Sequence, residues 1–292
     1  MAEPTTRILE TAGATLRYDV RPGTGADPRP LLLIGSPMDA TGFTTLASHF
    51  TDRTVVTYDP RGVGRSETAD GGPVEIRPEE HADDLARLID DLAAGPVDVF
   101  ASSGGAVNAL ALVARRPELV HTLVAHEPPA AGIVPDGAEA LAACADVHAT
   151  YLRDGWGVGM AKFIALTSHE GPFPADWSGL PVPPPETFGL PAGDDGRRDD
   201  PLLGRNLRFC TSYVPDTEAL KAVGAAGARI VVAAGEESRG QLAARAAAAL
   251  ADRLGTPLAV FPSHHAGFLG GEFGQQGAPE EFAKTLRAVL EG

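Results

Sequence analysis

Short apolar runs alternate along the chain with segments of helical periodicity. Residues 31–34, Leu-Leu-Leu-Ile, lack polar alternation and end at Gly35, which is typical of a parallel strand covered on both faces. Similar patterns predict strands over residues 54–58, 97–101, 120–125, 229–234 and 258–261, after an opening hairpin over residues 7–20. Helices are predicted over residues 44–50, 81–92, 106–114, 240–254 and 280–290. This order predicts an α/β fold with a mainly parallel sheet and helices on both of its faces.

The regular alternation stops between about residues 128 and 225. Helical patches such as residues 138–152 stand there beside a proline-rich stretch over residues 172–191. We therefore predict a core domain made of residues 1–130 and 220–292. A helical lid, or cap domain, of residues 131–219 is predicted to be inserted after the sixth strand.

One strand runs through a turn of small residues directly into a helix. Residues 97–106 read Val-Asp-Val-Phe-Ala-Ser-Ser-Gly-Gly-Ala, and a serine on such a turn lies near the positive end of the following helix. A turn centred on Ser103 has Ala101 and Gly105 at its crowded flanks, whereas one centred on Ser102 has the bulky Phe100 there. The sequence therefore favours Ser103 as a nucleophile. A plain turn in which Ser103 only caps the helix is the alternative.

From about residue 31 to its C-terminus, the chain resembles the α/β hydrolase family. Residues 58–66, Tyr-Asp-Pro-Arg-Gly-Val-Gly-Arg-Ser, resemble the family's turn after its fourth strand. Residues 101–105 are similar to its Gly-x-Ser-x-Gly elbow, with alanine in place of the first glycine. The resemblance implies an α/β-hydrolase sheet with a catalytic triad and an oxyanion hole, and it implies no metal and no organic cofactor.

The resemblance also suggests the base. A serine hydroxyl is a weak nucleophile near neutral pH, so a histidine must accept its proton. The last predicted strand runs into residues 262–268, which contain His264 and His265. His265 fits the family's loop, in which a small residue precedes the histidine.

Two backbone amides are the expected oxyanion donors. Gly104 N–H is the first, and the family's turn after residue 34 makes Ser36 the second. Ile34 stands where the family usually has histidine, and Pro37 has no N–H to offer.

The acid of the triad is the point at which the chain departs from the family pattern. Ser238 stands where the family usually presents aspartate. Glu127 follows the strand over residues 120–125, where some relatives, including certain haloalkane dehalogenases, carry their acid. The resemblance thus favours Glu127, with Glu237 and Glu236 as alternatives.

The composition of the chain limits the kinds of molecule that we expect it to bind. The 292 residues carry a formal net charge of −15, which would repel phosphate backbones and anionic lipid, so neither nucleic acid nor a membrane is expected. We find no secretory signal or membrane-spanning run and expect a cytoplasmic protein, and the residue usage suggests a bacterial one. The two cysteines do not indicate a disulfide framework. The expected partner is a small acyl molecule, with a homodimer as a candidate assembly.

These features together favour a serine hydrolase, of the carboxylesterase kind, that cleaves an ester, lactone or related acyl bond through an acyl-enzyme. Two alternatives stay open at this point. The same triad could serve an acyltransferase, cyclase or tailoring enzyme of small-molecule biosynthesis, or the scaffold could be a catalytically inactive ligand-binding relative.

Overall fold

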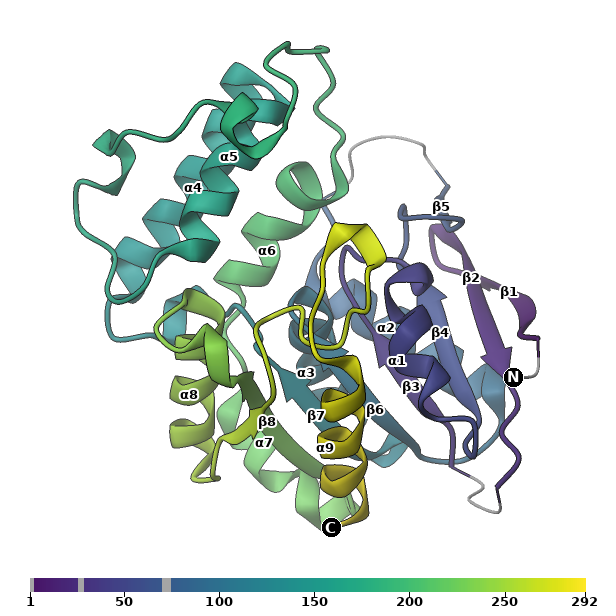
Figure 1. Cartoon of the computed structure of the whole chain (residues 1–292). Helices are drawn as coiled ribbons and strands as arrows, with labels where there is room; N and C mark the ends of the chain where they lie inside the picture. The colour runs from purple at the N-terminus through teal and green to yellow at the C-terminus, as the bar shows by residue number, and fades with distance from the viewer. Residues whose placement is uncertain (1–2, 26–28, 70–74) are drawn as a thin grey trace.

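The computed structural model describes residues 3–25, 29–69 and 75–292 and contains a central sheet (Figure 1). Its strands follow the order β1-β2-β4-β3-β6-β7-β8-β9, and β5 pairs with β2. The first antiparallel strands are β1 (Thr5–Thr11) and β2 (Ala14–Arg21). The parallel part consists of β3 (Leu31–Ile34), β4 (Val55–Asp59), β6 (Val97–Ser102), β7 (Val120–His126), β8 (Arg229–Gly235) and β9 (Ala259–Phe261).

Helices bury apolar side chains against both faces of this sheet. One core cluster joins the sheet to α2 (Pro78–Leu92), α3 (Gly104–Arg115) and α8 (Leu242–Leu254). A second cluster joins the opposite face to α1 (Thr44–Ser48) and α9 (Pro279–Glu291). The central parallel strands β3, β6 and β7 are buried almost throughout, which explains why they read as apolar runs in the sequence.

Between β7 and β8 the chain forms helices and no described strand. Besides short 3-10 turns, they are α4 (Gly137–Asp154), α5 (Trp156–Ser168), a π-helix (Pro201–Asn206), α6 (Leu207–Ser212) and α7 (Thr217–Ala222). A third core cluster holds α4, α5 and α6 together and includes two residues of α8. In Figure 1 these three helices lie together at the upper left, away from β1.

The predicted fold class is confirmed, with one difference in the strand count. The short β5 (Glu67–Thr68) pairs with β2 and was not predicted, because two residues are too few to show a pattern. The helical segment therefore follows the seventh strand of the chain, not the sixth as the sequence suggested.

The parallel strands end at one edge of the sheet. Ile34 pairs with Ala101, Ser102 pairs with His126, and Gly235 pairs with Phe261. The residues that follow these strands are therefore brought together, although they are far apart in the sequence. Ser103, Glu127 and the loop of His265 all lie in such positions.

A buried ion pair holds the turn that follows β4. The Arg61 guanidinium donates two hydrogen bonds to the Asp84 carboxylate on α2, both at 2.6 Å. The side chains are 10% and 1% exposed. This turn belongs to residues 58–66, which resemble a family motif. Its Arg61 binds α2 and so has a structural role.

We expect Asp84→Asn to lower the free energy of unfolding by about 3 kcal/mol, because the Arg61 charge would stay buried without its counterion. Urea denaturation measures this change. Glu280→Gln is the matched control, because it breaks the exposed Lys284–Glu280 pair, and it should change stability by less than about 0.5 kcal/mol. Equal effects of the two substitutions would contradict the assignment.

Candidate active site

Ser103 lies on a strained turn between β6 and α3. Its φ is 57° and its ψ is −129°, a backbone conformation that residues other than glycine rarely adopt. The turn is also closely packed: a Cβ placed at Gly105 would lie 2.6 Å from the carbonyl oxygen of Ile34. Small residues after Ser103 are therefore required by contact with β3, as expected of a nucleophile elbow.

Similar strain occurs at two neighbouring strand ends. Three of the five non-glycine residues with positive φ in the described chain are Ser103 after β6, Glu127 after β7 and Ser263 after β9. Each such residue costs about 1–3 kcal/mol, and strain of this kind gathers at functional sites. Backbone strain therefore indicates a functional site at the same sheet edge that the side chains indicate.

Glu127 and His265 are joined by a short hydrogen bond. His265 Nδ1 lies 2.5 Å from Glu127 Oε2, and the two side chains are 40% and 1% exposed. Glu127 Oε1 accepts a second hydrogen bond, of 2.8 Å, from the N–H of Gly235. Burial by itself raises the pKa of Glu127, but its bonds and charge interactions with His265 and the bond from Gly235 outweigh burial and lower the pKa to about 2. Glu127 is therefore a carboxylate at neutral pH.

The other two candidate acids do not reach this imidazole. Glu236 and Glu237 are exposed, and Glu236 Oε1 accepts a long hydrogen bond, of 3.5 Å, from the N–H of Ser263. The Ser238 hydroxyl is buried, with no hydrogen-bond partner among the residues that the structure describes. The structure thus brings Glu127 into contact with His265, whereas the described chain shows no hydrogen bond from Glu236 or Glu237 to this histidine.

The neighbouring histidines make other contacts. His264 Nε2 lies 3.1 Å from the carbonyl oxygen of Gln276, and its Nδ1 accepts from the N–H of Ala266. His126 is fully buried at the end of β7, and burial lowers its pKa to about 4, so it is neutral at neutral pH. Its ring packs 6.1 Å from the ring of His265, measured between centroids.

Ser36 and Gly104, the expected oxyanion donors, lie against each other. A Cβ placed at Gly104 would be 2.5 Å from the carbonyl oxygen of Ser36. Both residues line the same cavity as Ser103. The two backbone segments are thus in close contact beside Ser103.

A cavity of about 510 Å³ brings these residues together. Ser103 and His265 line it from the loops at the sheet edge, and Phe163 of α5 and Leu207 of α6 line it from the helical segment. In the described chain no hydrogen bond joins the Ser103 hydroxyl to His265; in free enzymes such bonds are often long and tighten when substrate binds. The volume suits a small molecule.

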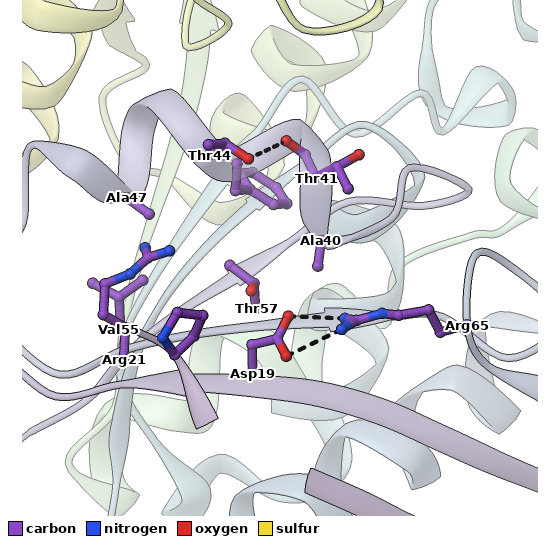
Figure 2. A pocket seen from close by; sticks show the side chains of 11 residues that line it. Asp19, Arg21, Ala40, Thr41, Thr44, Ala47, Val55, Thr57 and Arg65 are labelled. Atoms are coloured by element: carbon purple, nitrogen blue, oxygen red, sulfur yellow. Dashed lines mark hydrogen bonds and ion pairs between the residues drawn. The ribbon is translucent and has the colours of Figure 1, made fainter. Parts of the chain in front are cut away.

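A second cavity, of about 280 Å³, lies between β2, β4 and α1 (Figure 2). Asp19 and Arg65 lie side by side at its wall and form an ion pair of 2.8 Å. It holds neither Ser103 nor His265. Within the described residues no three His, Cys, Asp or Glu side chains are grouped so that they could hold a metal ion. The larger cavity is therefore the candidate active site.

Comparison with known proteins identifies relatives of this chain. Residues 31–149 match the family model described as alpha/beta hydrolase fold. The chain is 33% identical to the "Uncharacterized hydrolase YraK" of Bacillus subtilis (strain 168), over 97% of this chain and 95% of that protein.

Solved structures share the fold over nearly the whole chain. A thermophilic esterase from Thermogutta terrifontis aligns with a TM-score of 0.64 and 21% identity, covering 99% of this chain and 98% of that one. The enol-lactonase from Burkholderia xenovorans LB400 aligns with a TM-score of 0.65 and 16% identity, covering 98% and 100%. Among the described helices, none has the length and apolar character that a membrane span needs. The near full-length match to a relative, together with the elbow and the sheet order, shows that the chain belongs to the α/β hydrolase fold family.

Proposed function

We propose that the protein is a serine hydrolase that cleaves an ester, lactone or related acyl bond of a small molecule. In this proposal Ser103 is the nucleophile, His265 the base and Glu127 the acid. The observation that carries it is the hydrogen bond of 2.5 Å between His265 and Glu127, beside the cavity that Ser103 lines. The YraK relative is named as a hydrolase, which supports the same class of reaction.

The chemistry follows from these positions. His265 accepts the Ser103 proton while Oγ attacks the acyl carbonyl carbon, and the N–H groups of Ser36 and Gly104 stabilise the oxyanion. His265 then gives the proton to the departing alcohol oxygen, which leaves an ester on Ser103. A water that loses its proton to His265 attacks this ester, and the acid product and the free hydroxyl are formed. The ionised Glu127 stabilises the imidazolium in both steps.

The helical segment of residues 131–219 acts as the lid in this proposal. Phe163 and Leu207 of this segment line the cavity together with Ser103, so these helices limit the access of water to the acyl group. Acyl transfer to another acceptor would use the same residues, and the ratio of acylation to hydrolysis distinguishes the two reactions.

We expect a fluorophosphonate probe to label the protein at Ser103, and short p-nitrophenyl esters to be hydrolysed. Ser103→Ala should abolish both, because it removes the attacking oxygen, whereas Ser102→Ala should still be labelled. Mass spectrometry of the labelled peptide and the release of p-nitrophenolate are the measurements. A protein that is neither labelled nor active would overturn the proposed function, and labelling with little hydrolysis would indicate acyl transfer.

Glu127→Gln should lower kcat by roughly 10,000-fold, because a neutral amide neither holds the required tautomer of His265 nor stabilises its charged form. Glu237→Gln is the matched control, because it changes an exposed glutamate of the next strand end, and its kcat should stay within about twofold. Steady-state kinetics on one ester measures both variants. The opposite ranking would assign the acid to Glu237.

A further inference from the structure

We propose that the active-site cavity selects acyl substrates that carry no negative charge, an inference that rests on the proposed hydrolase function. Of the described residues that line the cavity, none is arginine, lysine, aspartate or glutamate. Residues 1–2, 26–28 and 70–74, which the structure does not describe, contain no basic residue in the sequence. A substrate carboxylate would therefore lose water without gaining a counterion.

The polar groups of the wall are neutral and suit a neutral ligand. Thr167 of α5, Gln241 before α8 and Gln275 offer hydroxyl and amide groups, while Phe163 and Leu166 offer apolar surface. Such a wall can bind an uncharged acyl chain and hydrogen-bond a carbonyl or hydroxyl group on it.

The charges nearby disfavour an anion further. Glu127 is held ionised directly behind His265. Arg205 lines a separate hollow of about 10 Å³ next to the cavity, and its Nη1 would lie 2.9 Å from a Cβ at Gly62, so the guanidinium lies against the turn that contains Gly62 and does not line the cavity itself. The chain as a whole carries a formal net charge of −15, which lowers the encounter rate with anions.

The test compares two p-nitrophenyl esters of the same acyl chain, mono-p-nitrophenyl adipate and its methyl ester, of which only the first carries a carboxylate. We expect kcat/KM for the methyl ester to exceed that for the carboxylate by more than about tenfold, because only the carboxylate must lose its hydration. Thr167→Arg should raise kcat/KM for the carboxylate ester, and Thr167→Met, of similar length without charge, should not. Equal kcat/KM values for the two esters would overturn the proposed selectivity. Failure of both esters, with no labelling of Ser103, would instead overturn the hydrolase function itself.

Independently, we infer that Asn206 is a positioning residue for the oxyanion site. Its Nδ2 donates to Ser36 Oγ at 2.5 Å, and its Oδ1 accepts from Cys210 Sγ at 2.6 Å. A Cβ placed at Gly104 would lie 2.9 Å from the same Oδ1. One side chain of the helical segment thus contacts both residues whose N–H groups are proposed to hold the oxyanion.

Two features hold the Asn206 amide in one orientation. Burial raises the pKa of Cys210 to about 12, so the thiol keeps its proton and donates it to Oδ1, which turns Nδ2 toward Ser36. Asn206 ends the π-helix, whose first turn is capped by Asp200, and the indole N–H of Trp156 donates to that carboxylate at 2.9 Å. The hydrogen bond from Asn206 to Ser36 therefore joins the helical segment to the proposed oxyanion loop. Cys210 and the capped π-helix hold Asn206 in place, as a second layer of residues supports a reacting group.

We expect Asn206→Ala to lower kcat by about 10- to 100-fold with little change in KM, because Ser36 would lose its fixed position. Asn206→Asp should lower kcat more, since it places a negative charge beside the oxyanion. Ser36→Ala keeps the backbone N–H, and the double variant with Asn206→Ala should be no slower than the slower single variant, because both changes remove one contact.

Val147→Ala is the control for general damage, because Val147 is buried in the core of the helical segment and does not line the cavity. It should lower Tm without changing kcat. Additive losses in the double variant, or a loss of Tm in Asn206→Ala with unchanged kcat, would overturn the positioning role. Continued labelling of Ser103 in every variant keeps this test separate from that of the hydrolase function.

Discussion

The hydrogen bond between His265 and Glu127 depends on the close alignment of strands that are distant in the sequence. The two residues are 138 positions apart, and their side-chain atoms lie 2.5 Å from each other. This contact requires β7, β8 and β9 to end at the same level, and Gly235 at the end of β8 lies between the partners. A Cβ at Gly235 would lie 2.6 Å from the carbonyl oxygen of Ser263, so the loop that carries the histidine can approach only a glycine.

The packing of the sheet offsets the backbone strain at these strand ends. Ser103, Glu127 and Ser263 have positive φ, and such strain persists only where the surrounding structure determines the backbone. The strands β6 and β7, which precede Ser103 and Glu127, are buried on both faces, against two separate apolar clusters. The core thus stabilises a strained edge at which the candidate site lies, which is a common division of roles between core and site.

The helical segment contributes to the site in two different ways. Its apolar side chains complete the cavity wall, and Asn206 contacts the loop of Ser36 across 170 positions of sequence. The neutral wall and the ionised Glu127 behind His265 give the cavity an electrostatic character that the net charge of the chain reinforces. In the proposed mechanism, substrate choice and oxyanion geometry therefore both depend on a segment that lies outside the regular alternation of strands and helices.

The sequence alone determined the alternation of strands and helices, because apolar periodicity reports burial directly, and it indicated Ser103 because only small residues fit its turn. It did not show β5, whose two residues carry no pattern. Between Glu127, Glu236 and Glu237 it could only weigh a family resemblance, since no local pattern reports which carboxylate turns inward. Tertiary structure brought Glu127 to His265 and Asn206 to Ser36, because a hydrogen bond depends on the distance between atoms in space and not on their separation along the chain.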